Sequence, residues 1–356
     1  MKIIKNIFWN TDQNRLRAGW RFLIYLILFF MLTIGKDVLV SSFNAAPLPK
    51  SLAYVMYLAG SLVLTWWMAR FVDRRSFIDL GFHFDRNWWL DFGFGLVLGA
   101  FLMTGIFISM KLAGWVSITS YAETVSGLPI SLAFLLQVLM FTVISINEEL
   151  AFRAYQLKNL AEGFAGRRRD SRSALLLAFL FSSALFGLLH MANGHATIFS
   201  AITTIFAGLL LSLPYMLTGE LGLAIGLHLT WNLFEANVYG FAVSGSTQAT
   251  HLLSIEVVGP STWTGGVYGP EVGLIGLIWA LIGCGLILLW TKRLRRKTGL
   301  PIPLAEGIEA TPELGRIKSA PRLSKVRTKS GISRKGFINL KNTPATIIRL
   351  LSRRFS

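Results

Sequence analysis

The stretch "SINEELAFRAYQ", residues 145–156, closes a run without charged residues on two adjacent carboxylates. Glu149 and Arg153 are four residues apart, so in a helix they share a face and form an ion pair in the favoured order. Glu148 is turned by about 100° from its neighbour and cannot share Arg153 equally. It is therefore the carboxylate left to exchange a proton, as a general base for water does.

Two later apolar segments carry imidazoles. In "FGLLH", Phe186 precedes His190 by one helical turn, and in "HLTWN" His228 and Asn232 project from the same helical face. A lone intramembrane His is often only a packed, hydrogen-bonded residue, and a His–Asn pair can simply join two helices, for about 1 kcal/mol. Acid–base or amide groups on three separate segments favour a functional site, because such groups are costly inside a bilayer.

Glu148, His190, His228 and Asn232 together form a hydrolytic set. The carboxylate with one imidazole could activate water, while the second imidazole and the amide could stabilise an oxyanion. Alternatively, Glu148, His190 and His228 could bind Zn²⁺ and leave a fourth position for water. The chain has no H-E-x-x-H sequence, which excludes a thermolysin-like metal helix but not dispersed ligands. Zn²⁺ therefore stays open as a cofactor.

The elements that must position these groups are membrane spans. The 356 residues are 53% hydrophobic and 15% charged, against about 25% charged in soluble domains. A span needs about 20 apolar residues. Stretches free of Asp, Glu, Lys and Arg cover residues 22–35, 51–69, 92–110, 124–147, 173–219 and 272–291. The longest stretch holds two spans, and 221–239 adds another. This predicts an all-α polytopic membrane protein of about eight transmembrane helices, with the site between helices four, five and seven.

Two features of these spans concern placement rather than chemistry. Gly93, Gly95 and Gly99 in the third span predict close helix packing. Arg21 extends the first span, and we expect its long side chain to snorkel to the interface. The segments after the second and fourth spans are rich in Arg and Lys and are expected to be cytoplasmic. Glu148 and Glu149 are expected to end the fourth span.

The distribution of charge divides the chain into three parts. Residues 1–21 are expected to form a cytoplasmic N-terminal segment, 22–291 the transmembrane domain, with the three polar segments inside 142–237, and 292–356 a basic cytoplasmic tail. Lys and Arg near span ends favour the cytoplasmic side. They predict that both termini lie in the cytoplasm. We expect an integral membrane protein of the plasma (inner) membrane.

The tail accounts for most of the net charge, carrying 17 Lys and Arg against three Glu, or +14 of the chain's +17. Anionic headgroups attract such a segment at about 1 kcal/mol per basic residue, so we expect a lipid-surface partner and no nucleic acid. The tail is expected to be largely disordered. Its end, "TPATIIRLLSRRFS", fits an amphipathic helix.

The blocks "EELAFR", "FGLLH" and "HLTWN", in this order, resemble the motifs of the CPBP family of intramembrane proteases. This family is also called Abi or CAAX-protease-like, and is related to the prenyl-protein endopeptidase. The resemblance implies that Glu148 is the general base, His190 its partner at the water, and His228 with Asn232 the oxyanion site. It assigns supporting roles to Glu149, Arg153 and Phe186. Ala154 stands where many members have Gly, which we interpret as tolerated packing variation.

This resemblance predicts a membrane-embedded peptidase that hydrolyses a peptide bond in a membrane-associated protein or peptide. It leaves open whether the enzyme is of the glutamate type or metal-dependent. Two alternatives remain: a catalytically silent protein of the same fold that binds partners, as in bacteriocin immunity, or a proton-coupled transporter that relays protons through the same Glu and His. A transporter predicts an inverted repeat, and none is visible in the sequence.

Overall fold

The computed structural model describes residues 7–11, 13–42, 47–124, 127–165 and 170–294. Seven helices within these ranges are long and apolar enough to cross a membrane. They are Ala18–Ser42, Pro47–Asp73, Arg86–Leu112, Ile130–Ala165, Ser171–Ala192, Ile198–Thr218 and Leu274–Arg293. Their length and composition confirm the all-α polytopic fold, and the chain is an integral membrane protein.

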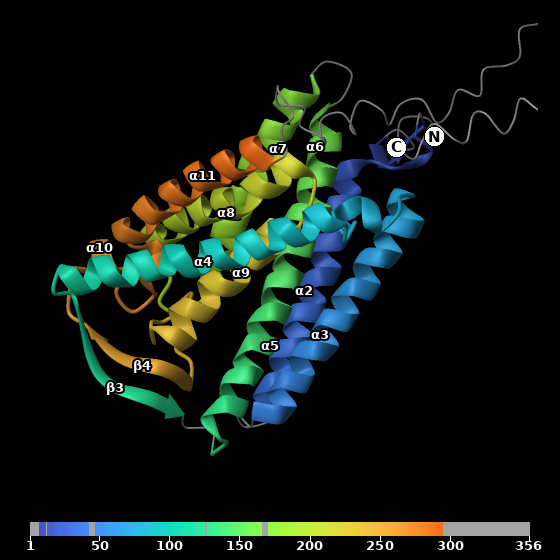
Figure 1. The fold of residues 1–356 in the computed structure, drawn as a ribbon. Helices are drawn as coiled ribbons and strands as arrows, with labels where there is room; N and C mark the ends of the chain where they lie inside the picture. Colours follow the sequence, from blue (N-terminus) through green and yellow to red (C-terminus); the bar gives the residue numbers. More distant parts are fainter. Residues whose placement is uncertain (1–6, 12, 43–46, 125–126, 166–169, 295–356) are drawn as a thin grey trace, which may run out of the picture. The chain divides into compact units, whose positions relative to one another are not determined.

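Most of these spans are formed by one long α-helix. The long helices are α2 (Ala18–Ser42), α3 (Pro47–Trp67), α4 (Arg86–Leu112), α5 (Ile130–Glu148), α7 (Ser171–Leu189), α8 (Ile198–Thr218) and α11 (Leu274–Leu294). The shorter ones are η1 (Met68–Asp73), η2 (Ile78–Leu80), η3 (Glu149–Leu157), α6 (Lys158–Ala165), η4 (His190–Ala192), α9 (Gly222–Leu233), η5 (Phe234–Val238), α10 (Ser261–Thr264) and η6 (Pro270–Val272). Helices α2, α3 and α5 run side by side (Figure 1).

The fourth span does not end at the paired carboxylates, and that expectation is wrong. Helix α5 passes directly into the π-helix η3 and then into α6, giving one continuous span of 36 residues from Ile130 to Ala165. Glu148 and Glu149 therefore lie near its middle. Every side chain of η3 is buried, which encloses the charged residues in protein. Single π-turns within α-helices occur often at functional sites.

The eighth expected helix, at 221–239, is present as α9 followed by η5 but is not one of the seven long spans. All twelve residues of α9 are buried, and the helix contacts α4, α5 and α8. It is an internal helix surrounded by the others. A helix that is apolar all round and enclosed in this way places its few polar side chains inside the bundle.

Close packing of α4 on α9 depends on two of the three predicted glycines. A Cβ on Gly95 would lie 2.4 Å from the carbonyl oxygen of Leu223, and one on Gly99 would lie 2.3 Å from Thr230 Oγ1. Neither distance is sterically possible, so both positions need glycine for the helices to meet. Gly93 has no atom within 4 Å of such a Cβ, and its predicted packing role is wrong.

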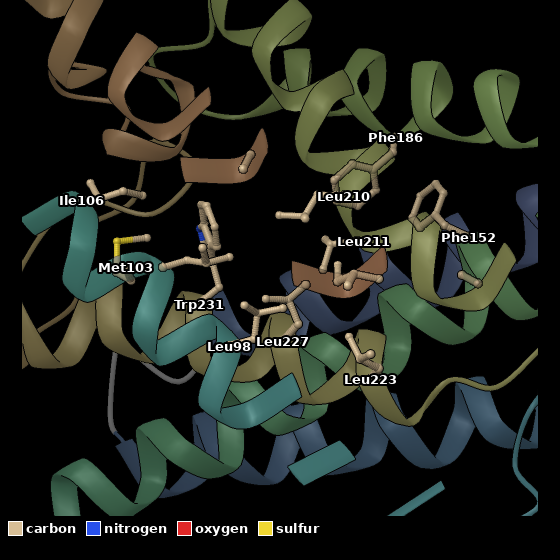
Figure 2. Close-up of a cluster of buried hydrophobic side chains, with 14 of the residues drawn as sticks. Leu98, Met103, Ile106, Phe152, Phe186, Leu210, Leu211, Leu223, Leu227 and Trp231 are labelled. Carbon is tan, nitrogen blue, oxygen red and sulfur yellow. The ribbon is translucent and has the colours of Figure 1, made fainter. Parts of the chain in front are cut away.

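The apolar core fills the space between these helices. Figure 2 shows Leu98 and Met103 of α4 together with Leu227 and Trp231 of α9, which belong to one buried cluster. The cluster also includes Leu210 of α8, and it extends to Phe152 and Phe186. These last two rings reach the charged residues of η3, so the core continues directly into the polar centre.

Two strand pairs accompany the helices, although none was predicted. Strands β3 (Val116–Thr124) and β4 (Thr250–Val257) pair antiparallel, with Val116 opposite Val257 and an irregularity between Ile118 and Ser120. The segment "VSITSYAET" is rich in the β-branched and aromatic residues that favour strands. A second, two-residue pair joins β1 (Trp9–Asn10) to β2 (Arg15–Leu16).

Arg21 is buried, so the expected snorkelling is wrong. Its side chain is 1% exposed and pairs with Asp73 Oδ1 at 2.8 Å and with Glu162 Oε2 at 3.0 Å. Arg15 and Arg75 pair with the same Glu162, at 3.1 and 2.7 Å. We call these five residues the N-terminal ion cluster. Two carboxylates from η1 and α6 converge on Arg21, which compensates the guanidinium inside the protein instead of at the interface.

The basic tail and its terminal amphipathic helix lie outside the described residues from position 295 onward. The predicted domain boundaries, the cytoplasmic placement of both termini and the choice of plasma membrane stay predictions. Helix α2 begins at Ala18, four residues before the boundary at 22 that the sequence predicts for the transmembrane domain.

Candidate active site

The fourth span directs its two carboxylates to different surroundings. Glu149 and Arg153 are fully buried, and Arg153 Nη1 lies 3.1 Å from Glu149 Oε1, outside hydrogen-bonding geometry but close enough for an ion pair. The Glu148 side chain is 28% exposed and borders a cavity. The structure thus forms the ion pair that the four-residue spacing predicts, and it leaves Glu148 outside that pair.

Arg153 is held on three sides by groups from other helices. Its Nε donates to Ser212 Oγ at 3.2 Å, and its Nη2 donates to the Gly208 carbonyl at 3.5 Å. The guanidinium carbon lies 4.4 Å from the centre of the Phe186 ring, a cation–π distance. These contacts offset part of the cost of burying the charge. Phe186, one of the predicted supporting residues, acts on Arg153 directly.

Helix α9 brings His228 against both glutamates. His228 Nδ1 lies 2.8 Å from Glu149 Oε1, and Nε2 lies 3.9 Å from Glu148 Oε2. An ionised carboxylate only accepts hydrogen bonds, so Nδ1 carries the proton and donates it to Glu149. In the neutral ring, Nε2 then faces Glu148 as an acceptor. We call Glu148, Glu149, Arg153 and His228 the site cluster.

His190 enters from the end of α7. Its Nδ1 lies 2.7 Å from the carbonyl oxygen of Phe186, and the two rings of these residues are 4.4 Å apart, centre to centre. Because a carbonyl can only accept, this contact places the proton on Nδ1. Nε2 is then the nitrogen available to a ligand. Phe186 therefore supports both Arg153, through its ring, and His190, through its backbone.

One cavity of about 740 Å³ connects these residues. Glu148, His190, His228 and Asn232 all border it, so the four predicted catalytic residues share one space. Glu149 and Arg153 do not border the cavity and stand behind it. Its walls also include apolar and aromatic side chains from α2, α3, α5 and α8, namely Phe29, Phe30, Tyr57, Met140, Ile144 and Leu210. A cavity of this size, with apolar and aromatic walls and convergent polar groups, is typical of ligand sites.

Several residues at this centre were not predicted. Ser212 and Gly208 hold Arg153 from α8, while Ser244 and Glu271 border the cavity from the loop and turn near β4 and α11. Ser212 is a polar residue within the apolar stretch 173–219. Its polarity was a signal of a role inside the bundle, but the prediction followed the three motif blocks instead. Ser244 and Glu271 lie in a segment that composition alone assigns to an external loop, and only folding brings it to the cavity.

The candidate metal ligands do not converge. A zinc site needs three protein donors at about 2.0–2.2 Å from one ion. In the ranges that the structure describes, no group of three or more His, Cys, Asp or Glu side chains could hold a metal ion. Glu148, His190 and His228 share the cavity without forming such a group, although the contacts of Nδ1 leave Nε2 of each imidazole free. The residues in their present arrangement do not fit a three-ligand zinc centre.

Comparison with known proteins finds one family model that matches the segment containing this centre. Residues 129–234 match the family model described as Rce1-like, type II CAAX prenyl endopeptidase. No curated protein and no solved structure matches the chain. The matched segment runs from the start of α5 to the end of α9 and contains every residue of the site cluster together with His190 and Asn232. Over residues 129–234 the chain therefore matches the Rce1-like CAAX prenyl endopeptidase family, which confirms the resemblance predicted from the three motif blocks.

Proposed function

We propose that this protein is an intramembrane endopeptidase that hydrolyses a peptide bond in a membrane-associated protein or peptide. One observation carries the proposal: Glu148 borders a cavity of about 740 Å³ and lies 3.9 Å from an imidazole that a second carboxylate orients. A carboxylate, two imidazoles and an amide around one cavity supply a base and hydrogen-bond donors for acyl transfer to water.

The reaction begins with water bound between Glu148 and His190. Glu148 takes one proton from the water, while Nε2 of His190 accepts a hydrogen bond from the other hydrogen and orients the oxygen towards the scissile carbonyl. The oxygen adds to the carbonyl carbon, and the carbonyl electron pair moves onto its oxygen. The electron pair on that oxygen then re-forms the C=O bond as the C–N bond breaks. The electron pair of the C–N bond stays on nitrogen, which takes the proton from Glu148, and the products are a carboxylic acid and an amine.

Two side chains of α9 can stabilise the negative charge that develops on the carbonyl oxygen. Asn232 can donate from its amide, and His228 can donate from Nε2 when the ring is protonated. Glu149, bonded to Nδ1, fixes the orientation of this ring, as the buried acid does in a Ser-His-Asp triad. Arg153 fixes Glu149 in turn, so that two buried residues outside the cavity position a third residue inside it.

The first experiment compares membranes from cells that express the wild type with membranes from cells that express Glu148→Gln. Proteomics of protein termini should find cleaved peptides that depend on the wild type. The substrates found are then tested with purified protein in liposomes, where Glu148→Gln should lower kcat by about 10²–10⁴-fold. Glu123→Gln, on the exposed side of β3, makes the same chemical change away from the cavity and is the matched control.

The outcome distinguishes the peptidase from a protein of the same fold that only binds partners. If Glu148→Gln retains the biological function and neither protein yields a cleaved product, binding is the function and hydrolysis is not. A thermal melt of each variant keeps this comparison interpretable, because Glu148 has no ion pair closer than 3.9 Å and its loss should leave the melting temperature within about 2 °C.

A further inference from the structure

Two acidic residues outside the motif blocks form a second polar group at the cavity. Glu235 lies on η5 and is fully buried. Glu271 lies on η6, immediately before α11, and borders the cavity together with Ser244. Both residues lie beyond 129–234, the segment that matches the family model. The proposed hydrolysis uses neither of them.

The contacts of these residues aim Glu271 at the cavity and place Glu235 behind it. The backbone nitrogen and the hydroxyl of Ser244 both donate to Glu271 Oε1, at 2.7 and 2.9 Å. The backbone nitrogen of Glu271 lies 3.4 Å from Glu235 Oε1, and the two carboxyl groups interact directly. Glu235 Oε2 is buried and has no hydrogen-bond partner among the described residues.

This acidic pair lacks the close cationic partner that Glu149, Asp73 and Glu162 have. Each of those three pairs with at least one guanidinium, whereas across the described ranges no Lys, Arg or His lies within 4.0 Å of Glu235 or Glu271. His190 is the imidazole that acts on Glu271 from a longer distance. Burial raises the pKa of the Glu271 carboxyl above its ordinary value. Two carboxyls in contact cannot both ionise readily, so the pair shares at most one negative charge, which a cationic ligand would stabilise.

We propose that Glu271, backed by Glu235, forms a subsite that binds a cationic side chain of the substrate, the ammonium of Lys or the guanidinium of Arg. The pair offers a negative charge at the wall of the same cavity that holds Glu148, and it has acceptor capacity that the protein does not use. A buried charge without a partner favours a ligand of opposite charge and disfavours one of the same sign. This inference rests on the proposed function, since it concerns the substrate of that site.

Two basic residues, which would favour an anionic ligand, lie elsewhere on the cavity wall. Lys36 of α2 and Lys50 of α3 border the cavity, and Lys36 lies 5.0 and 5.6 Å from the centres of the Tyr54 and Tyr57 rings. Lys36 also pairs with Asp37 at 2.6 Å, so its charge is already compensated. Lys50 is only half-buried, near the start of α3. The acidic pair is buried and is not compensated by a close cation, which is why we assign charge selection to Glu271.

Binding to a catalytically disabled protein tests the subsite without requiring cleavage. The protein carries Glu148→Gln and is held in nanodiscs. The probes are three fluorescent Leu/Ala decapeptides, N-acetylated and amidated, that differ only in a central Lys, Gln or Glu. We expect the Lys peptide to bind at least 10-fold tighter than the Gln peptide and the Glu peptide to bind weakest. Adding Glu271→Gln should reduce the Lys preference to within about 2-fold, because the amide keeps the volume and carries no charge.

Two further variants separate charge from structure. Glu235→Gln leaves Glu271 as a single carboxylate and should retain the Lys preference, whereas Glu235→Gln/Glu271→Gln should abolish it even if Glu271→Gln alone folds poorly. Ser244→Ala removes one hydrogen bond and no charge, so the preference should persist. Equal binding of the three peptides by the Glu148→Gln protein, or a Lys preference that survives the double substitution, overturns the subsite. Neither result bears on whether Glu148 is the base, which the cleavage experiment decides separately.

Discussion

The N-terminal ion cluster and the site cluster each draw acids from the same 36-residue span, Glu162 in the first and Glu148 with Glu149 in the second, but they differ in one respect. In the first, Glu162 is shared by three guanidiniums, and Asp73 pairs with two of them, at 2.8 and 3.5 Å. In the second, Arg153 pairs only with Glu149, and Glu148 faces the cavity. Acids near arginines on a membrane helix are therefore not a site in themselves. A site arises where one carboxylate is left out of the ion pairs and borders a cavity.

Breaking the N-terminal ion cluster should give the largest effect on stability. Glu162→Gln leaves Arg15, Arg21 and Arg75 with Asp73 alone, and removing one member of a buried ion pair costs about 3–5 kcal/mol. We expect a much lower melting temperature with normal cleavage per folded molecule, because Glu162 does not touch the cavity. Thermal unfolding in detergent, with activity normalised to folded protein, measures both. A specific loss of kcat in the folded fraction would contradict a purely structural role.

Breaking the site cluster at Arg153 should impair both stability and chemistry. Arg153→Met leaves Glu149 as a buried carboxylate without its guanidinium, at a cost of about 3 kcal/mol. The orientation of His228 then suffers, and we expect kcat to fall by more than 10-fold with a smaller change in KM. The decisive comparison is with Glu162→Gln at equal folded fraction. Equal kcat values for these two variants would remove the distinction between the clusters.

A milder substitution on α8, Ser212→Ala, also tests the difference between the two clusters. Ser212→Ala deletes the hydroxyl that accepts from Arg153 Nε at 3.2 Å, and a hydrogen bond to a charged group contributes about 1.5–3 kcal/mol. We expect a stability loss at the lower end of this range and a kcat reduced by a few-fold, since Glu149 still holds Arg153. Ser183→Ala, on α7, is a matched control because its hydroxyl bonds only within its own helix. A larger loss of kcat in the control than in Ser212→Ala would oppose the assignment.

The smallest effect is expected from chelation. Because the described His and acidic residues do not form a three-ligand set, treating the purified protein with EDTA or 1,10-phenanthroline should leave cleavage within about 2-fold of the untreated value. Restoration of a lost activity by added Zn²⁺ would show that the site cluster reorganises around a metal, and the glutamate-type mechanism would then be wrong. Metal analysis of the active preparation accompanies the assay.

The spacing of residues predicted the centre of the site well. The Glu149–Arg153 pair and the separation of Glu148 from it follow from helical geometry alone, because both depend on residues within one turn. The interactions across helices were not predictable in the same way. His228 bonds Glu149 rather than simply pairing with Asn232, and Ser212, Gly208 and Glu271 reach the centre from segments distant in sequence.

Hydropathy identified most of the spans but misjudged two boundaries. It placed the end of the fourth span at the first carboxylates, since a charge normally ends a lipid-exposed run. The charges of η3 and the arginine at position 21 are nevertheless enclosed by protein, where partners replace water. The same limitation made α9 look like an ordinary span, although it is short and buried on all sides.

The sequence by itself determined a polytopic helical membrane protein, the three motif blocks, and the pairing of Glu149 with Arg153, because all of these are set by local composition and helical periodicity. Tertiary structure alone decided which charges are neutralised, which carboxylate borders the cavity, and that Glu235 and Glu271 meet beside it. The physical reason is that burial and pairing depend on neighbours from other helices. Residue type and spacing along the chain do not specify those neighbours until the helices have packed.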